Sequence, residues 1–386
     1  MKKIKLLTLL LVSLSLHAQN KLIVLPNIAL LKDTSENRLL RTSLDNFLLL
    51  AQKPNEENSL VLESGKVETF ILLDEINGIE KSARMKDDFF YKPYLTNVVP
   101  LENNQYLIQL SHIGVDNSIP YLRASFELVA HKAGATFQFA SPLLRNTAGW
   151  KTAVVGNNTF HYRTTINQST LKEFGKLTSF FDKKLQATGK RVDYYCCDDI
   201  LELQKLVGVL YKSDYNGRSA SVWSSSYRDQ KLIVLGNKNE TFNHFDPHDL
   251  FHDRLSLVVA RNKINKPVDE GCAYLYGGSW GFSWKEIYIA FKDQVASNKN
   301  LNWKEVKDNP VYFKTGEYNN SADNIVNALL IQEIEKKKGF AGVWKLLNVG
   351  PVEKGHAQYY QTLEQLTGIA KDNYNEKVWA LVNSMP

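Results

Sequence analysis

Two histidines that stand four residues apart, His248 and His252, lie in a segment whose beginning is marked for a helix. Asp246 is a favourable N-cap residue, and Pro247 suits the first helical position because its missing N–H group would have no intrahelical partner there. With about 3.6 residues per turn, side chains four apart project from the same side of a helix. The segment therefore predicts a helix that begins at Pro247 and presents two imidazoles together.

Apolar residues cover a broad arc of the same helix, which predicts that it is largely buried. These residues are Leu250, Phe251, Leu255, Leu257, Val258 and Val259. The two histidines lie at one margin of the arc, beside a polar strip formed by Asp249, Asp253 and Ser256. The expected arrangement is a buried helix with two imidazoles and a carboxylate at its edge.

A third ligand is expected from the next helix, which is predicted to begin at Pro267 and to pass through Glu270. Two histidines with one carboxylate, and a fourth position left for water, are typical of catalytic zinc sites. In such a site Asp249 would be the general base that takes a proton from the water. The alternative is an ordinary pair of core histidines. With 8 histidines in 386 residues, this spacing arises by chance about 0.17 times, which favours a metal site.

With these residues, the chain resembles the gluzincin clan of zinc metallopeptidases, in particular the peptidase-MA-like group. The family pattern is H-E-x-x-H, a spacer of about 18 residues, and then an acid–glycine pair. The chain has H-D-L-F-H at 248–252, a spacer of 17 residues, and then Glu270-Gly271. The resemblance implies that His248, His252 and Glu270 bind zinc.

The chain departs from the family at the general base, where Asp249 replaces the usual glutamate. An aspartate places its carboxylate roughly one methylene, ~1.3 Å, short of the family position, and such a misplacement can reduce a rate by about 100-fold. Asp249 also has a structural interpretation. With Asp246 as N-cap it falls at the third helical position, where an acidic side chain satisfies free N–H groups and the helix dipole. Both roles remain open for Asp249.

Residues 1–18 are predicted to be a signal peptide. Three lysines precede an apolar run that ends near Leu16, and His17-Ala18 offers a small-residue exit. The run is too short to span a bilayer, and no later stretch is long and apolar enough to do so. We therefore expect an exported protein, periplasmic or extracellular, without a membrane span.

The charge of the chain does not indicate a nucleic-acid partner. Removal of the three leader lysines from the 47 basic residues leaves 44 against 41 acidic residues, a net charge of +3. Such a near balance lacks the basic footprint that nucleic-acid binding requires. The chain has three cysteines, Cys196, Cys197 and Cys272. They either pack as apolar side chains or include one disulfide, and at least one of them stays outside any intramolecular pair.

The chain beyond the signal peptide is longer than one ordinary core and is predicted to form two domains, 19–165 and 166–386. In the first, apolar spacing predicts helices at 38–52 and 66–79, and alternating patterns predict strands after them, the last two within 150–162. Helices followed by an antiparallel meander predict an N-terminal α+β roll with an antiparallel sheet.

The second domain is predicted to be a gluzincin-like mixed α/β domain with a helical C-terminal subdomain, so the fold class is α+β. In that family the strand at the sheet edge holds an extended peptide by backbone pairing, and 217–226 is the candidate strand here. A glycine-punctuated aromatic loop, 274–282, follows Glu270, and its rings either line a substrate cleft or pack beneath the site. Ser283 and Glu286 form a capping box for the next helix.

These features predict an exported zinc-dependent, peptidase-like hydrolase that uses metal-activated water on a peptide or protein substrate. Gluzincin aminopeptidases carry a Gly-x-Met-Glu-Asn motif, which this chain lacks, so an aminopeptidase is not favoured. The alternative, which rests on Asp249, is a catalytically impaired gluzincin-like protein that acts as a binding or structural module.

Overall fold

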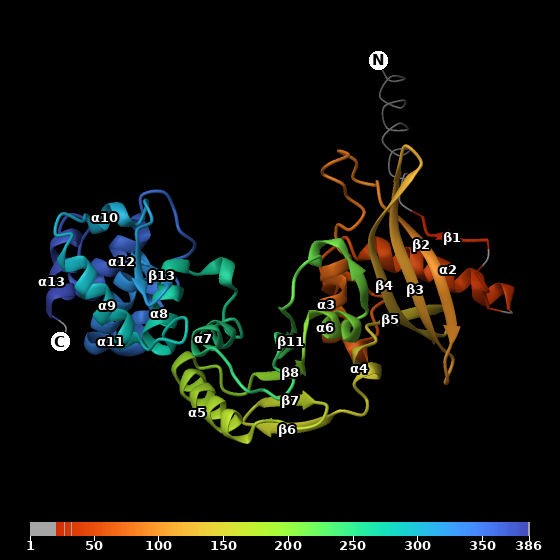
Figure 1. Cartoon of the computed structure of the whole chain (residues 1–386), viewed down its shortest axis with the longest axis horizontal. Helices are drawn as coiled ribbons and strands as arrows, with labels where there is room; N and C mark the ends of the chain where they lie inside the picture. The colour runs from red at the N-terminus through yellow and green to blue at the C-terminus, as the bar shows by residue number, and fades with distance from the viewer. Residues whose placement is uncertain (1–20, 27, 32, 385–386) are drawn as a thin grey trace, which may run out of the picture. The chain divides into compact units, whose positions relative to one another are not determined.

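The computed structural model describes residues 21–26, 28–31 and 33–384. The expected signal peptide, 1–18, lies outside them. The chain is an α+β protein, as predicted, with most strands in its first two thirds and a helical C-terminal region (Figure 1). Its internal contacts divide it into two compact units.

The first unit contains the described residues up to Ile166 and also Arg191–Thr241, and the second contains the rest. The predicted domain boundary after residue 165 lies where the chain first leaves the first unit. Residues 191–241, predicted for the second domain, return to the first unit because their strands pair with strands that precede the boundary. Hydrophobic periodicity identifies a strand but not its partner, so the sequence could not show this return.

The first sheet of the first unit has the order β1-β2-β3-β4-β5, with β9 paired to β4, and β1–β2 is parallel whereas the other pairs are antiparallel. Its strands are β1 (Ile23–Val24), β2 (Lys92–Pro100), β3 (Gln105–Asp116), β4 (Ile119–Ala133), β5 (Thr136–Ala140) and β9 (Val209–Lys212). The helices α2 (Thr34–Leu50) and α3 (Lys66–Ile76) share its hydrophobic core, where the rings of Phe47 and Phe139 lie 4.9 Å apart. The predicted α+β fold is confirmed, with helices before an antiparallel meander from β2 to β5, whereas the parallel strand β1 and the later strand β9 were not part of the prediction.

The core of this roll encloses a histidine. His112, on β3, is fully buried and packs edge-on against Phe126, with 5.7 Å between ring centroids. Neither of its ring nitrogens has a hydrogen-bond partner among the described residues. Because burial disfavours the charged imidazolium, the pKa of His112 is lowered to about 3. His112 therefore behaves as a neutral aromatic residue of the core.

We expect His112 to make the protein less stable in mild acid. The unfolded chain binds a proton at this residue below about pH 6.5, and the folded chain only near pH 3, so stability falls as the pH decreases through this window. Between pH 7 and pH 5 the free energy of unfolding should decrease by about 2 kcal/mol on this account, as measured by urea titration. A His112→Leu variant should lose this part of the pH dependence. An unchanged dependence in the variant would contradict the prediction.

The second sheet of the first unit is mixed and has the order β10-β11-β8-β7-β6. Its strands are β6 (Lys151–Val155), β7 (Asn158–Tyr162), β8 (Arg191–Cys197), β10 (Ser221–Tyr227) and β11 (Gln230–Gly236). β8 lies between β7 and β11 and is parallel to both, and each edge is an antiparallel hairpin. The predicted meander includes β6 and β7, but these strands belong to this second sheet. The candidate edge segment, 217–226, contains most of β10, which does lie at the sheet edge.

Short elements complete the first unit. They are α4 (Leu143–Asn146), α6 (Ile200–Val207), and the 3-10 helices η1 (Asn55–Glu57), η2 (Glu63–Gly65) and η3 (Ser213–Tyr215). Asp199 caps α6 by accepting a hydrogen bond from the N–H of Glu202, and Gly208 ends the helix in the left-handed conformation that glycine tolerates.

The second unit is mainly helical. Its elements are α5 (Gln168–Leu185), α7 (Pro247–Leu255), η4 (Arg261–Lys263), α8 (Lys266–Gly277), α9 (Trp284–Ala296), α10 (Trp303–Val306), β12 (Tyr312–Thr315), β13 (Tyr318–Ser321), α11 (Ala322–Leu347), α12 (Ala357–Thr367) and α13 (Tyr374–Ser384). The capping box of Ser283 and Glu286 is present at α9. Gly339 breaks the helical backbone of α11 with φ of +64°. The predicted helical C-terminal subdomain is confirmed.

All three cysteines are free and buried, Cys196 and Cys197 on β8 and Cys272 on α8. Burial raises the pKa of each thiol above its ordinary value. The structure therefore favours apolar packing, rather than a disulfide or a reactive thiolate, for these residues.

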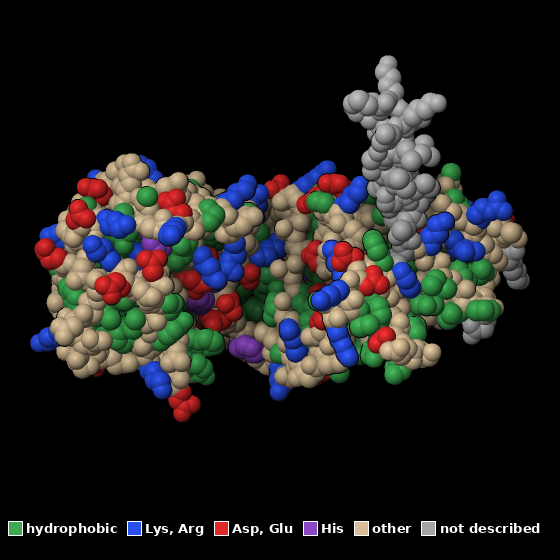
Figure 2. All heavy atoms as spheres, turned by 90° about the horizontal axis from the view of Figure 1, so that it is seen from above, with side chains coloured by type: hydrophobic (Ala, Val, Ile, Leu, Met, Phe, Trp, Pro, Cys, Tyr) green, Lys and Arg blue, Asp and Glu red, His purple; other side chains and the backbone are tan. Residues whose placement is uncertain are grey.

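Among the helices of the described residues, none has both the length and the apolar character that a bilayer crossing requires. Figure 2 shows basic and acidic side chains interspersed over the visible face of each unit. The visible surface therefore carries charges of both signs rather than one continuous basic or acidic face.

Candidate metal centre

Helix α7 begins as the sequence predicts. Oδ1 of Asp246 accepts a hydrogen bond from the backbone N–H of His248 at 2.9 Å, and Pro247 occupies the first turn. The helix is shorter than expected, because it ends at Leu255 and residues 257–259 lie beyond it. Both histidines nevertheless fall within the helix, so their common direction is preserved.

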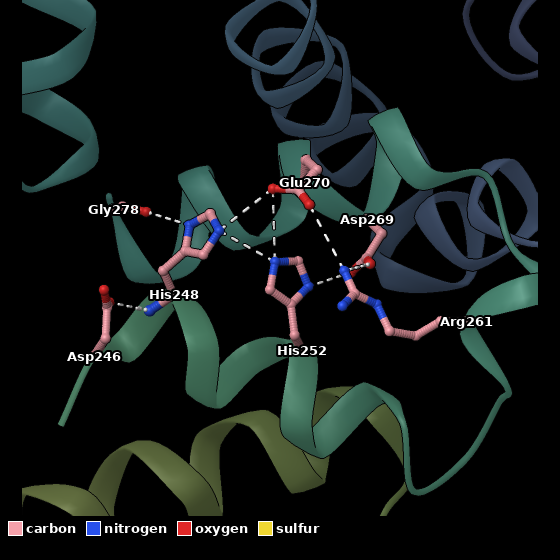
Figure 3. Close-up of polar contacts among 7 residues, drawn as sticks. All are labelled: Asp246, His248, His252, Arg261, Asp269, Glu270 and Gly278. Atoms are coloured by element: carbon pink, nitrogen blue, oxygen red, sulfur yellow. Dashed lines mark hydrogen bonds and ion pairs between the residues drawn. The ribbon is translucent and has the colours of Figure 1, made fainter. Parts of the chain in front are cut away.

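The two histidines of α7 meet Glu270 of α8, as Figure 3 shows. The Nε2 atoms of His248 and His252 are 3.1 Å apart. Oε2 of Glu270 lies 3.4 Å from Nε2 of His248 and 3.7 Å from Nε2 of His252. The structure thus brings together the three residues that the resemblance implies as ligands. Within the described part of the chain, no other group of histidine, cysteine and acidic side chains converges in this way.

Each imidazole is held by a partner on its other nitrogen. Nδ1 of His248 lies 2.8 Å from the carbonyl oxygen of Gly278, and Nδ1 of His252 lies 2.7 Å from Oδ1 of Asp269 (Figure 3). A carbonyl or carboxylate oxygen only accepts, so in the neutral tautomers Nδ1 carries the hydrogen and Nε2 offers a lone pair. Both Nε2 lone pairs therefore face the point where the side chains meet, as metal ligation requires.

Asp269 and Arg261 contact the converging residues but were not among the site residues predicted from the sequence. Asp269 is only 1% exposed on its side chain, and its second oxygen lies 3.3 Å from a guanidinium nitrogen of Arg261. The same nitrogen lies 3.7 Å from Oε1 of Glu270, the oxygen that does not face the histidines. A signal for Asp269 was present, since ligating histidines usually donate to a carboxylate and this acid precedes Glu270 directly. Arg261 lies in a polar connection and carried no such signal.

The electrostatics of the group favour positive charge beside Glu270. Burial lowers the pKa of His252, but hydrogen bonds to Asp269 and Glu270 outweigh burial and raise the pKa to about 9. Burial raises the pKa of Glu270, but its hydrogen bonds with His248 and His252 outweigh burial and hold the pKa below its ordinary range. The carboxylate is therefore ionised over all ordinary pH values, and a metal ion would displace the proton that His252 otherwise holds.

The separations between the three atoms fit a divalent cation. With ligand atoms about 2.0–2.2 Å from zinc in a tetrahedral site, two ligand atoms lie roughly 3.3–3.6 Å apart. The observed separations of 3.1, 3.4 and 3.7 Å have this scale. Two facing imidazole lone pairs also require a cation or a proton between them. The residues present can hold a metal ion, and imidazole with carboxylate suits several divalent ions besides zinc.

Two glycines allow α8 to approach its neighbours closely. A Cβ on Gly271 would lie 2.7 Å from Cβ of Asn327 on α11, and a Cβ on Gly277 would lie 2.6 Å from the backbone of Pro247 and His248. Any larger residue would push α8 away from α11 or from the start of α7. This packing gives a structural reason for glycine directly after Glu270 and keeps the carboxylate within reach of the imidazoles.

Asp249 lies at the first turn of α7, outside the converging group. It is exposed, and it has no hydrogen-bond partner among the described residues. Partial burial and the charge of Asp246 raise the pKa of its carboxyl above the ordinary value. The structural role left open for Asp249 is not supported, because Asp246 and not Asp249 accepts the hydrogen bond from the N–H group at the start of α7.

The aromatic loop after Glu270 divides into a buried and an exposed part. Tyr274 is buried, with its ring centroid 5.4 Å from that of His248. Trp280 is 56% exposed, lies at φ of +55° in a turn closed by Ser279 and Phe282, and stacks 5.1 Å from the ring of Tyr318. One aromatic ring therefore packs beneath the site and another remains available on the surface.

His356 and His244 do not join the centre. Nε2 of His356 lies 3.1 Å from Oδ1 of Asp308, which occupies this nitrogen. His244 precedes the N-cap residue Asp246 and is not part of the helix. Tyr318 is 48% exposed and is engaged by Trp280. Neither Tyr318 nor His356 is shown in contact with the three converging residues.

Comparison of the chain with known protein families, with curated proteins and with solved structures finds no match in any of the three. The functional argument therefore depends on the residues and geometry of the candidate centre.

Proposed function

We propose that this chain is an exported zinc-dependent hydrolase of the gluzincin type that cleaves peptide bonds and is not an aminopeptidase. The observation that carries the proposal is the convergence of two imidazole nitrogens and one carboxylate oxygen within 3.1–3.7 Å of one another. The spacing of these residues in the sequence and their fixed Nδ1 partners support the same interpretation. The predicted signal peptide supports a periplasmic or extracellular location.

In this proposal, different residues bind the metal ion and orient its ligands. His248, His252 and Glu270 would hold the ion, and Gly278 and Asp269 fix the orientation of the two imidazoles. A bound zinc ion would supply Lewis-acid polarisation of a carbonyl group and would lower the pKa of water. Arg261 holds the second oxygen of Glu270 and so limits rotation of that carboxylate.

Asp249 is the general base in this proposal, and its short side chain gives a direct test. A glutamate at this position would carry its carboxylate about one methylene further, into the range that the family uses. We expect Asp249→Glu to raise peptidase activity by up to about 100-fold and Asp249→Asn to abolish it. The measurement is the rate of cleavage of a broad peptide pool, followed by mass spectrometry with zinc present and after chelation. Both variants should keep the metal content of the parent protein, since Asp249 is not a ligand.

A second candidate function is a catalytically impaired gluzincin-like protein that serves as a binding or structural module. The observation that favours it is Asp249, which is short, exposed and without a hydrogen-bond partner among the described residues. If the parent protein cleaves no peptide but the Asp249→Glu variant does, this second function is supported. If neither protein cleaves any peptide although both bind metal, peptide hydrolysis is rejected.

A further inference from the structure

A cavity of about 560 Å³ opens in the first unit, where η2 and the start of α3 face the second sheet. It contains none of the residues of the candidate metal centre. Its floor is formed by His161 of β7 and by Asp193 and Tyr195 of the neighbouring strand β8. Its side walls come from the first turn of α3 and from the turn between β10 and β11. With Leu144 of α4 also in its lining, the cavity is assembled from five separate segments of the chain.

The charges at the rim of the cavity neutralise one another. Nζ of Lys66 lies 2.7 Å from a carboxylate oxygen of Glu63 and 3.4 Å from the hydroxyl of Tyr227. The guanidinium of Arg228 lies 5.0 Å from the centroid of the Tyr227 ring, and Asp229 follows it in the turn. Two basic and two acidic side chains thus share the rim, and this part of the cavity has no net charge.

The inner end of the cavity has an excess of negative charge. Nε2 of His161 lies 3.0 Å from Oδ1 of Asp193, so this carboxylate has a partner. Glu68, in the first turn of α3, accepts a hydrogen bond from its own backbone N–H, and no ion pair joins its carboxylate to a lysine or arginine of the described residues. Burial and the nearby charge of Asp193 raise the pKa of Glu68 above its ordinary value, and the charge of His161 offsets this only in part. Two acidic side chains and one imidazole therefore line this end of the cavity, and only Asp193 is hydrogen-bonded to the imidazole.

A rigid aromatic surface lies beside these carboxylates. The ring of His161 stacks on that of Tyr195 with 4.2 Å between centroids and 5° between planes. Tyr195 is itself buried and hydrogen-bonds Thr147 through its hydroxyl, so the stack is fixed. A carboxylate is the usual partner of an ammonium group in a protein, and a flat ring beside it can pack against an apolar carbon skeleton.

A bare metal ion does not fit this end of the cavity. Within the described residues, the ligand atoms of Glu68, His161 and Asp193 do not gather closely enough to surround an ion, unlike those of the candidate metal centre. An ammonium group fits better, because its three N–H donors reach separate acceptors about 2.8 Å away each. The attached carbon skeleton can lie along the His161 ring.

We propose that this cavity is a binding site for a small organic amine, with Glu68 and Asp193 as the acceptors of its ammonium group and His161 as the surface for its carbon skeleton. The site is separate from the proposed hydrolase activity and does not depend on it. Glu63 and Lys66 lie at the rim of the cavity, and their opposite charges cancel, so this pair does not change the net charge near the bound amine.

Benzylamine and benzyl alcohol form a matched pair of probes for this site, since they differ mainly in the positive charge. We would titrate each into residues 19–386 by isothermal calorimetry at pH 7, with and without a metal chelator. Benzylamine should bind saturably and at least about tenfold more tightly than benzyl alcohol, because hydrogen bonds to a charged group carry that difference. Binding that persists in the chelated protein separates this result from the behaviour of the metal centre.

The isosteric variants Glu68→Gln and Asp193→Asn should each weaken benzylamine binding by about tenfold or more. Glu63→Gln, at the rim, should bind benzylamine as the parent protein does. Thermal unfolding of each variant checks that the fold is intact, and a folded Glu68→Gln protein is expected because glutamine preserves the shape of the side chain. Absence of saturable benzylamine binding, equal binding of benzyl alcohol, or an unchanged affinity in Glu68→Gln would each overturn the proposal.

Discussion

Substitution of His248 or Glu270 by alanine is expected to reduce zinc affinity by at least about 100-fold. Loss of an outer partner of a metal ligand already costs about 10–100-fold, so loss of the ligand itself should reach or exceed that range. The parent protein should carry close to one zinc ion per chain after reconstitution, since three donor atoms already lie within 3.7 Å of one another. Elemental mass spectrometry of purified residues 19–386, with competition against a coloured chelator, measures both quantities.

Two further variants show whether the effect is specific. His244→Ala should leave zinc binding unchanged, because His244 precedes the cap of α7 and does not belong to the converging group. Asp269→Asn should give an intermediate loss, since Asp269 only orients His252 through a 2.7 Å hydrogen bond. If the parent protein binds no zinc after reconstitution, His248 and His252 are core packing residues and not metal ligands.

The second large effect is expected from a buried ion pair that holds α7 in place. Oδ1 of Asp182, on α5, accepts a hydrogen bond from Nε of Arg254 at 2.5 Å, and Oδ2 accepts one from Nη2 at 2.8 Å. Arg254 is completely buried, and the side chain of Asp182 is 10% exposed. Arg254 lies two residues after His252, so the bidentate pair joins the helix that carries the two histidines to α5 within the second unit.

Asp182→Ala should destabilise the second unit by about 3–5 kcal/mol, because it leaves a buried guanidinium without its counter-charge. The measurement is the free energy of unfolding from urea titration. Removal of the exposed pair of Lys337 and Glu333, by Glu333→Ala, is the matched control and should cost less than about 1 kcal/mol. The double variant Asp182→Leu with Arg254→Met should recover most of the loss, since an apolar pair of similar volume avoids the buried charge. A loss below about 1 kcal/mol in Asp182→Ala would show that the pair does not hold α7.

Local signals in the sequence predicted most of the individual elements. Asp246 and Pro247 placed the start of α7, and Ser283 with Glu286 placed the start of α9. These signals work because capping and backbone freedom depend on residues within a few positions of one another. The end of α7 was wrong by four residues, since an apolar arc continues through Val259 although the helix stops at Leu255.

Long-range pairing was beyond the reach of these signals. The strands β6 and β7 have the pattern of a meander, but β7 pairs with β8, about thirty residues further along the chain. The pattern of a strand records which face is buried and carries no information on which edge is hydrogen-bonded. The grouping of 191–241 with the first unit follows from these pairings, and for that reason a division of the chain in sequence order could not describe it.

By itself the sequence determined the fold class and the helix that presents His248 and His252, because the spacing of side chains on one helix is a local property. Glu270 was nominated by the resemblance to the gluzincin pattern. Only the tertiary structure decided that the carboxylate of Glu270 meets both imidazoles, that Asp269 and Arg261 support the group, and that Asp249 stays exposed outside it. The physical reason is that these positions depend on how closely α8 packs on α7 and α11, which Gly271 and Gly277 permit.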